Sequence, residues 1–469
     1  MPEKYHIEAK QISPRLPRIG KCSVVDWRED CAGCHNCVKK ACVFDRYREE
    51  TQYIRGLNNV DTIYAECMGC FSCVQNCTKG ILALSANPAY NQLGNDYWTP
   101  AIIETTWAQA ENGKIPVSGA GYRGKFTGPG FDAMWTDMSE IVRPTRDGIH
   151  GREYISTAVD IGRKPDFLSF DTGTNRLALP PIIDLPMPII IDMLPAAYRR
   201  TNLLPLIAAT ASRTGILTII DYADIEFLGP DKHKYFPNLA FYLGNCSTLP
   251  ATEALQKVKM VEIADNPDID RHIKELKKIR AGVIVSVRVQ MNASGVARSI
   301  ELGQNPDIEV LHLVADINGN QIGVNQPKFI KDMVLEVHRS LVKSGHRDGI
   351  TLIAGGGIAL AEHMAKQIIC GADAVTIELP LLIALECKLC KTCDPGMKCP
   401  VNVDKMDAAY AVGRMFNLIV AWHDQLIEVM GAMGIREARR LRGETGRAMF
   451  FEELEEETFG KLFGSRKRA

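Results

Sequence analysis

Three short stretches of the sequence hold most of its cysteines, and their spacing is typical of iron-sulfur ligation. They read CAGCHNCVKKAC, CMGCFSCVQNC and CKLCKTCDPGMKCP. Two-residue gaps let a short loop wrap three thiolates around one cubane, and a more distant thiolate completes the site. The spacing therefore predicts three sets of four ligands: Cys31, Cys34, Cys37 and Cys42; Cys67, Cys70, Cys73 and Cys77; Cys387, Cys390, Cys393 and Cys399.

The first two groups lie close together, and the second has the spacing of a bacterial two-cluster ferredoxin. In such modules the fourth cysteine of each run binds the other cluster, so we expect Cys42 to complete the second site and Cys77 the first. Val43 and Thr78 stand where a proline usually follows, which weakens the crosswise assignment but not the cluster prediction. Zinc is the alternative, but zinc sites are typically built from two CxxC pairs.

The third cysteine group lies at the end of residues 187–403, and the pattern of these residues predicts an α/β barrel. Short apolar runs alternate with helix-like stretches such as DIDRHIKELKKIRA, which is typical of parallel α/β folds. Seven runs are visible: MPIIID, GILTIID, KMVEIA, VIVSVRV, VLHLVAD, ITLIAGGG and DAVTIEL. With one further strand unrecognised around residues 225–243, they predict a (β/α)8 TIM barrel with its functional groups at the carboxyl ends of the strands.

Three glycines end the predicted seventh strand, in AGGGI at residues 354–358. In (β/α)8 barrels the loops after strands seven and eight commonly form a phosphate site, because backbone N–H groups can close on an oxyanion there. The position predicts a phosphorylated cofactor, with a simple tight turn as the alternative. A second glycine string, GAGYRG at residues 119–124, has no strand before it and no helix after it, so we expect no NAD(P)-binding domain.

Composition and charge narrow the function classes. Lys and Arg number 55 against 56 Asp and Glu, so no overall basic field attracts nucleic acid or an anionic membrane. The amino terminus lacks the apolar core of a signal peptide, and aspartates and prolines interrupt the most apolar stretch, so we expect a cytoplasmic protein without a transmembrane segment. Clustered thiols in a reducing compartment favour metal or redox work over disulfides. Three isolated cysteines are predicted to be ordinary buried residues: Cys22, Cys246 and Cys370.

Several segments together resemble the FMN-binding synthase domain of the glutamate synthase family. They are MSEIVRPTRDGIHGREYIS at residues 138–156, the strand PIIIDM, the AGGGI turn and a cysteine cluster that ends in CP. The resemblance covers about residues 115–450, and the amino-terminal two-cluster module is similar to that of short, archaeal-type members. It implies an FMN-containing barrel with an iron-sulfur cluster beside it that passes electrons to the flavin. The cysteine loop at 387–400, placed directly after the eighth strand, would hold that cluster.

The resemblance also suggests roles for single residues. In the larger members three cysteines at this place hold a three-iron cluster; Cys387, Cys393 and Cys399 occupy similar positions, and Cys390 adds a fourth thiolate, which favours [4Fe-4S] over [3Fe-4S]. Arg288 stands where the family carries a lysine near the flavin ring, and it is the predicted catalytic residue. The predicted flavin contacts are Asp192, Met193, Arg288, Gly355, Gly356, Gly357 and Gly371.

The chain departs from the family pattern in four ways. It begins Met1-Pro2, so we expect no glutaminase domain with an amino-terminal cysteine nucleophile. The two glycine-rich substrate segments are replaced by KMVEIADNPDID and ADINGNQIG, which leaves the substrate open. Arg288 replaces a lysine. Finally, Glu378-Leu379 stands where the family has glycine followed by Thr or Arg near the phosphate; we expect Glu378 to face away and main-chain donors to hold the phosphate.

The sequence thus predicts four parts: a two-cluster ferredoxin-like domain (1–95), a linker and barrel-covering segment (96–186), the FMN-binding barrel with its cluster loop (187–403) and a helical carboxyl-terminal extension (404–469). The leading hypothesis is an oxidoreductase that passes electrons from the amino-terminal clusters through the third cluster to FMN, for reductive chemistry on a small amino or oxo acid. The alternative is an electron-transfer subunit of a larger redox complex that has lost glutamate synthase activity. Both require a redox partner protein. A third hypothesis is a structural subunit without flavin.

Overall fold

The structure is a computed structural model of the 469-residue chain. The residues that it describes are 8–16, 19–26, 32, 34, 36, 40–41, 69–115, 130–136, 155–165, 167, 169–173, 176–178, 180–199, 201–244, 253–390, 399, 401–402 and 405–464. The string GAGYRG and five predicted ligands lie outside these residues: Cys31, Cys37, Cys42, Cys67 and Cys393.

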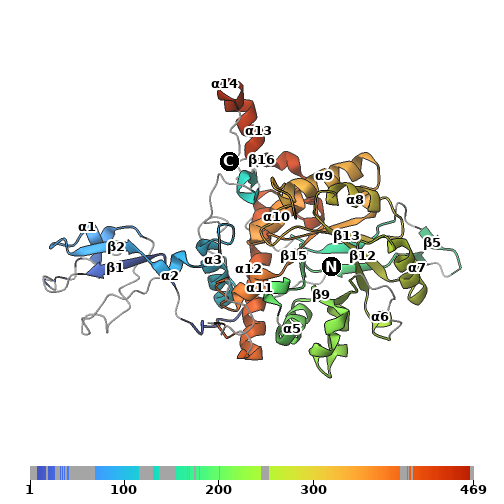
Figure 1. Ribbon diagram of the computed structural model, residues 1–469, viewed down its shortest axis with the longest axis horizontal. Helices are drawn as coiled ribbons and strands as arrows, with labels where there is room; N and C mark the ends of the chain where they lie inside the picture. Colours follow the sequence, from blue (N-terminus) through green and yellow to red (C-terminus); the bar gives the residue numbers. More distant parts are fainter. Residues whose placement is uncertain are drawn as a thin grey trace.

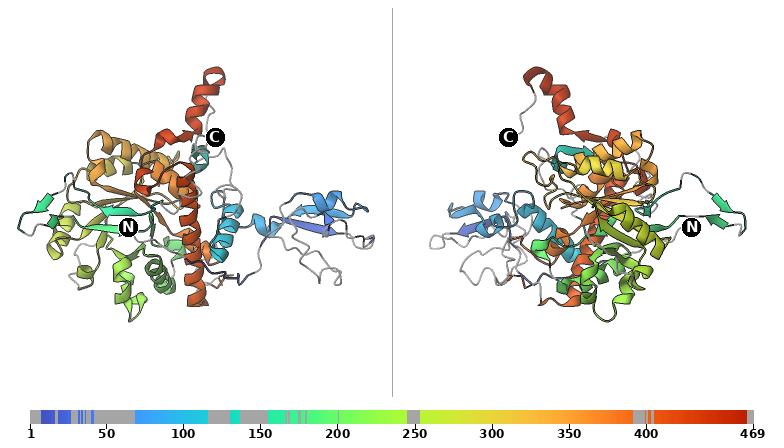
Figure 2. Two further views of the ribbon diagram at one scale, coloured as in Figure 1. Left: turned by 180° about the vertical axis from the view of Figure 1, so that it is seen from behind. Right: turned by 45° about the vertical axis from the view of Figure 1, so that its right-hand side comes forward.

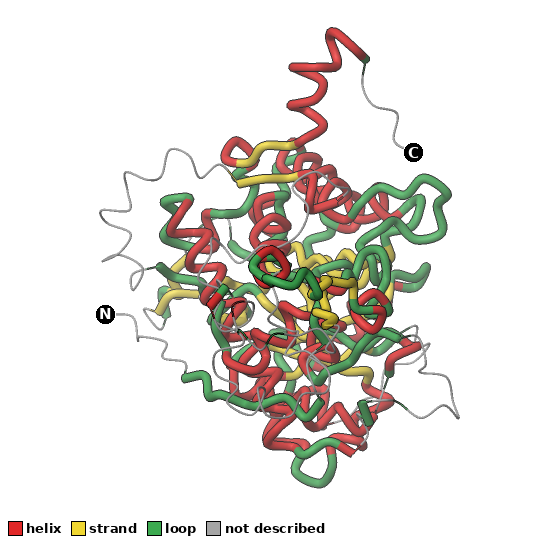
Figure 3. Tube along the Cα trace, turned by 90° about the vertical axis from the view of Figure 1, so that its left-hand side faces the viewer, coloured by secondary structure: helices red, strands yellow, loops and turns green. Residues whose placement is uncertain are grey.

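Eight parallel strands close into a barrel, as the sequence predicts (Figure 1). In Figure 3 the strands lie at the centre with helices around them. The seven apolar runs form seven of the strands, and the eighth falls inside the range where a strand was missing. In chain order the strands are β8 (Ile189–Ile191), β9 (Leu217–Asp221), β10 (Leu239–Tyr242), β11 (Met260–Ala264), β12 (Ile284–Gln290), β13 (Val310–Val314), β14 (Thr351–Gly355) and β15 (Ala374–Ile377).

Helices of the barrel follow the strands with an apolar face turned inward. In α7, Ile269, Ile273 and Leu276 are buried at helical spacing, while lysines occupy the outer face. Between β9 and β10 two 3-10 segments, Tyr222–Leu228 and Lys232–Asn238, replace the usual helix. The helices that follow the barrel strands are α5 (Leu204–Thr214), α6 (Glu253–Lys257), α7 (Ile269–Ile279), α8 (Gly295–Leu302), α9 (Ile330–Lys343), α10 (Ala361–Ile369) and α11 (Leu379–Ala384).

A long helix, α12 (Ala408–Ala432), packs along the side of the barrel against α3 (Pro100–Asn112), α5 and α10 (Figure 2). The local sequence sets both helix starts: Asp407 caps α12 by accepting from the Tyr410 amide at 2.9 Å, and Thr99 caps α3 with Pro100 at the first helical position. Every residue of α10 is buried, because α12 and residues 130–136 cover its outer side. The barrel and α12 therefore share one core.

The amino-terminal part projects to the left of the barrel in Figure 1. Its described portion contains an antiparallel pair, β1 (Cys22–Asp26) with β2 (Leu82–Ala86), and two one-turn helices, α1 (Ser72–Gln75) and α2 (Pro88–Asn91). Since half of its eight predicted ligands lie outside the described residues, the ferredoxin-like module stays a prediction.

Smaller sheets complete the molecule. The pair β4 (Val159–Gly162) and β7 (Ile182–Leu185) closes the amino end of the barrel, where the Gly162 amide donates to Thr351 Oγ1 at 3.1 Å. β5 (Ser169–Asp171) pairs with β6 (Arg176–Ala178), and β3 (Met134–Thr136) pairs with β16 (Ala448–Phe450). Two short helices, α13 (Phe451–Glu455) and α14 (Lys461–Phe463), follow β16. Within the described part of the chain, none of the helices has the length and apolar character needed to span a bilayer.

Candidate active site at the carboxyl end of the barrel

A buried network of charged side chains, centred on Arg288 of β12, lies at the carboxyl end of the barrel. Arg288 Nε donates to Glu262 Oε1 of β11 at 2.6 Å, and an Nη2 group donates to Asp192, which directly follows β8. Exposure is 8% for Arg288, 6% for Asp192 and 0% for Glu262. Ser286 lies two residues before Arg288 and bonds the same carboxylate, as expected because alternate strand residues share a face. The ring of Tyr242 lies 5.2 Å from the guanidinium.

Glu262 is the most enclosed member of this network. Its Oε2 accepts from Ser286 Oγ at 2.9 Å and lies 3.0 Å from His312 Nδ1, and His312 Nε2 lies 3.1 Å from Thr376 Oγ1. Burial by itself would raise the pKa of Glu262, but the charges and hydrogen bonds of Arg288 and His312 lower it to about 2. Glu262 is therefore ionised at neutral pH, and one guanidinium is shared between two carboxylates.

The network contains both predicted and unpredicted residues. The structure brings together Arg288 and Asp192, and the Met193 amide donates to Asp192 Oδ1 at 2.8 Å at the same strand end. Glu262 and His312 were not predicted as site residues from the sequence. Each is a polar residue inside an otherwise apolar strand, in KMVEIA and VLHLVAD, and a buried polar group needs a partner. A single polar residue inside an apolar strand could therefore have marked both as candidate site residues.

The predicted glycine turn follows β14, at the same end of the barrel. Gly356 and Gly357 have φ of 92° and 73°, in the region that favours glycine. Among the described residues, neither amide donates a hydrogen bond, although the Gly357 carbonyl accepts one from the Tyr97 hydroxyl. Trp98 Nε1 donates to the Ile317 carbonyl at 2.9 Å, so the segment before α3 covers this turn. Two buried amides thus remain available to an anionic group.

Gly371 does not belong to this site, and its assignment as a flavin contact is wrong. It precedes β15, whereas Gly356 and Gly357 follow the parallel strand β14, so the glycines lie at opposite ends of the barrel. Its carbonyl accepts from Arg347 Nη2 at 2.7 Å, and an added Cβ would lie 2.4 Å from His338 Cβ. Gly371 therefore has a packing role. In the sequence, a glycine before a strand is equally compatible with packing and with phosphate binding.

Replacing Gly356 by alanine should destabilise the barrel even without any ligand. A Cβ would lie 2.5 Å from the Asp316 carbonyl oxygen, and the positive φ adds strain, so we expect a loss of about 1–3 kcal/mol. Urea unfolding of the flavin-free variant measures this loss. Gly323→Ala is the matched control, because Gly323 has φ of 70° but nothing within 4 Å of its added Cβ. An equal loss in both variants would show that the contact with Asp316 is unimportant.

Two described cysteines of the amino-terminal groups, Cys34 and Cys77, lie in surroundings that favour thiolates. Cys34 Sγ lies 3.5 Å from the hydroxyl of Thr78, the residue after Cys77. This contact lowers the pKa of Cys34. Burial opposes ionisation of Cys77, but hydrogen bonds from the backbone at residues 79–82 outweigh it and lower its pKa. Within the part of the chain that the structure describes, no three potential ligands converge on one metal position.

The third cysteine group begins after α11, so a short helix separates it from β15; the expectation that it follows the strand directly is wrong. The buried carboxylate of Glu386, next to Cys387, accepts from the amides of Arg15 and Leu16 at 2.8 and 3.1 Å. On the other side, the Gly94 amide donates to the Lys388 carbonyl at 3.0 Å. Segments from both ends of the amino-terminal part therefore contact the start of the cluster loop.

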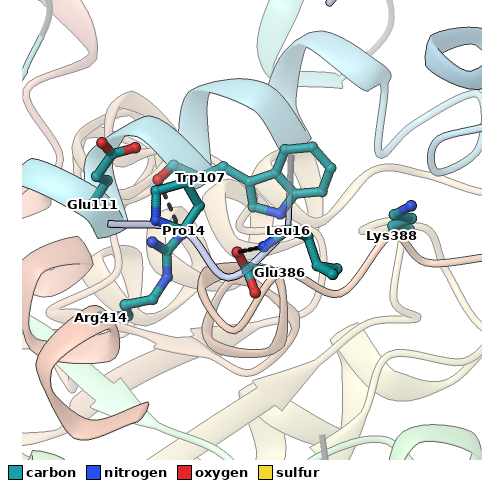
Figure 4. Close-up of a pocket in the computed structure, with 7 residues that line it drawn as sticks. All are labelled: Pro14, Leu16, Trp107, Glu111, Glu386, Lys388 and Arg414. Atoms are coloured by element: carbon teal, nitrogen blue, oxygen red, sulfur yellow. Dashed lines mark hydrogen bonds between the residues drawn. The ribbon is translucent and has the colours of Figure 1, made fainter. Parts of the chain in front are cut away.

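A pocket lies at this junction. Figure 4 shows its lining, which comes from residues 8–16, from α3, from the start of the cluster loop and from α12: Pro14, Leu16, Trp107, Glu111, Glu386, Lys388 and Arg414. Trp107 Nε1 is buried without a hydrogen-bond partner among the described residues. The pocket marks the joint between the amino-terminal segment and the cluster loop, away from the Arg288 network.

Comparisons with known proteins agree with the barrel part of the sequence analysis. The family model described as "Conserved region in glutamate synthase" matches residues 247–436. An archaeal-type glutamate synthase [NADPH] of Dehalococcoides mccartyi is 25% identical over 90% of this chain and 93% of its own length. The archaeal glutamate synthase [NADPH] of Archaeoglobus fulgidus is 24% identical over 93% of this chain and 96% of its own length.

Among solved structures, a mutant flavocytochrome b2 with pyruvate bound is similar with a TM-score of 0.43 and 14% identity, covering 81% of this chain and 88% of its own. At this level of similarity the match adds nothing to the barrel already traced from the strand pairing.

Proposed function

Because the chain belongs to the glutamate synthase family, we propose that it is an iron-sulfur oxidoreductase that binds FMN at the carboxyl end of its barrel. Electrons would enter through the amino-terminal clusters and pass through the Cys387 cluster to the flavin, for reductive chemistry on a small amino or oxo acid. The observation that carries the proposal is the pair of buried amides at Gly356 and Gly357, which donate to no described residue and follow the seventh strand of the barrel.

The residues around these amides suit an FMN site. Backbone N–H groups of a glycine turn hold phosphate without a cationic side chain. Arg288 would place a positive charge near the flavin ring, held in position by Asp192 and Glu262. When bound, FMN would supply hydride and single-electron chemistry. The protein would contribute the fixed guanidinium and the enclosure of the site.

The cysteine environments support the electron route. Amides around Cys77 and the contact of Cys34 with Thr78 favour thiolate ligands in the amino-terminal part, for which we propose two [4Fe-4S] clusters. Cys387 and Cys390 begin the loop that would hold the third cluster, as [4Fe-4S] or [3Fe-4S]. The contacts of residues 8–16 and Gly94 with this loop connect it to both ends of the amino-terminal part. We also propose a cytoplasmic location and a redox partner protein.

One observation favours the alternative, an electron-transfer subunit that has lost glutamate synthase activity. The Arg288 guanidinium is already bonded by two carboxylates, so its charge is largely neutralised before any acidic substrate arrives. A site for a dicarboxylate normally keeps an unneutralised cation.

The test is anaerobic purification of the whole protein with its partners, followed by counts of flavin, iron and sulfide and an assay of glutamate formation. We expect one FMN and about 12 iron atoms per chain, the content of three four-iron clusters. Protein with all its iron that neither contains nor takes up FMN would contradict the proposal. Full cofactor content without glutamate formation from 2-oxoglutarate and ammonia or glutamine, with reduced ferredoxin as donor, would favour the electron-transfer subunit.

A further inference from the structure

Glu378, directly after β15, is a buried residue whose carboxyl group has no partner in the described part of the chain. The residue is 7% exposed, and its side chain makes no hydrogen bond or ion pair with any residue that the structure describes. Burying such a group without a partner is costly, so an unpaired carboxyl at the functional end of a barrel points to a missing ligand.

The side chain faces the barrel mouth and not away from it, contrary to the expectation from the sequence. Thr376, two residues earlier, points into the barrel, where its hydroxyl lies 3.1 Å from His312 Nε2. Residues two apart on a strand share a face, which directs Glu378 inward. The charges of Asp192 and Arg288 both act on the Glu378 carboxyl, which agrees with this direction.

Glu378 also lies beside the glycine turn. The parallel pairing of β14 and β15 joins Ala354 with Val375, and the same register continued for three residues brings Gly357 level with Glu378. An added Cβ on Gly355 would lie 2.2 Å from Thr376 Oγ1, so the two strand ends stay close beyond the last pair. Among the described residues, the unpaired carboxyl and the two unpaired amides therefore follow neighbouring strands at the same end of the barrel.

Its protonation state decides what this carboxyl can do there. Burial, and after it the negative charge of Asp192, raise the pKa of Glu378, the charge of Arg288 lowers it, and together they set it to about 8. Arg288 also forms ion pairs with Asp192 and Glu262. At neutral pH Glu378 is thus mostly a neutral acid, which is a hydrogen-bond donor and carries no charge that would repel an anion.

We propose that Glu378, as a protonated acid, donates a hydrogen bond to the FMN phosphate beside the Gly356 and Gly357 amides, and so makes flavin binding sensitive to alkaline pH. The inference rests on the proposed function, since it requires FMN to occupy this site. It explains how a carboxylic acid is tolerated where the family pattern has glycine.

The expected direction follows from the charges. Below the pKa of Glu378 the acid donates to the phosphate; above it, a carboxylate faces a dianion. The phosphate itself loses its second proton near pH 6 and keeps a constant charge from about pH 7.5 upward. FMN affinity should therefore fall by up to roughly tenfold for each pH unit above the pKa of Glu378. The charged and titratable groups nearby, Asp192, Arg288, Glu262 and His312, remain the same in the variant below.

The experiment is a fluorescence titration of the flavin-stripped full chain, iron intact, with FMN from pH 6.5 to 9.5. For the wild type we expect the dissociation constant of FMN to rise at least about tenfold between pH 7 and pH 9.5. Glu378→Gln keeps an N–H donor but cannot ionise, so its affinity should stay close to the neutral-pH value throughout. Riboflavin, which lacks the phosphate, should bind with little pH dependence to both proteins.

Glu362→Gln is the matched control. Glu362 is another buried carboxyl with a pKa raised by burial, to about 7, but it lies on α10 and accepts from Gln425 Nε2 of α12 at 2.9 Å. This variant should keep the pH dependence of the wild type. A flat FMN profile in the wild type, or an unchanged one in Glu378→Gln, would overturn the inference and leave the proposed function standing. No FMN binding at any pH would overturn both.

Discussion

Replacing Arg288 by alanine is expected to lower the free energy of unfolding by about 3–5 kcal/mol, because it leaves two buried carboxylates without their counter-charge. Glu262 is fully enclosed and Asp192 is 6% exposed, so water cannot take the place of the guanidinium. Arg288→Lys should lose less, since it keeps the charge but gives up the fixed fork that reaches both acids. Urea unfolding of both variants, compared with the wild type, measures these losses in the free energy of unfolding.

The pH dependence gives a second check on Arg288. The pKa of Glu262 lies near 2 in the folded protein, below its ordinary value of 4.5, so its stabilising contribution is complete above pH 4.5 and is lost as the pH falls toward 2. The difference between wild type and Arg288→Ala should therefore be largest at neutral pH and shrink in acid.

Arg298→Ala provides the control for the loss of a paired arginine. Arg298 bonds Asp265 through Nη2 at 2.9 Å, but its side chain is 28% exposed and water can replace the pair. We expect a loss of at most about 1 kcal/mol. Equal losses for Arg288→Ala and Arg298→Ala would mean that burial does not set the strength of the Arg288 network.

The sequence predicts the barrel well, because each strand is a local signal. Apolar runs of strand length stood out between amphipathic helices such as α7, and each of these runs became a strand. The exception, β10, follows two 3-10 segments, one with Pro237 inside it, in place of an amphipathic helix. Because no amphipathic helix precedes β10, only the approximate range of this strand, residues 225–243, could be predicted.

The candidate site was harder to predict, because its members meet through the closure of the barrel. Arg288 was found from the resemblance, yet its partners Asp192 and Glu262 are 96 and 26 residues away in the chain. The direction of the Glu378 side chain could not be predicted, because it follows from the direction of Thr376. The contact of Thr376 with His312 shows that Thr376 points into the barrel. Gly371 was misplaced for a related reason: a glycine near a strand does not reveal which end of the barrel it occupies.

Arg414→Met should cost about 3 kcal/mol or more and loosen the segment that precedes the amino-terminal cysteines. Arg414 of α12 is 0% exposed, and its guanidinium donates to three carbonyls from different segments: Ala384 at 2.6 Å, Ile12 at 3.3 Å and Trp107 at 3.2 Å. Among the described residues it makes no ion pair, so its value lies in these bonds. Methionine fills much of the volume but removes the donor from all three carbonyls, including that of the buried Ala384.

Because the three carbonyls lie on different segments, we expect Arg414→Met to loosen residues 8–16 locally as well as to lower the stability of the whole protein. Ile12 belongs to the segment that Glu386 holds through the Arg15 and Leu16 amides, so losing Arg414 should raise the rate of proteolytic cleavage within residues 8–16 before the barrel unfolds. Arg213→Met is the control: Arg213 is an exposed residue of α5 that stacks on Phe416 of α12, 3.7 Å from the ring centroid, and its loss should cost about 0.5–1 kcal/mol without faster cleavage. If Arg414→Met destabilises the protein while cleavage of residues 8–16 stays at the wild-type rate, the arginine supports only the barrel. The attachment of the amino-terminal segment then depends on its other bonds, such as those of Glu386 and of the Glu111 carbonyl.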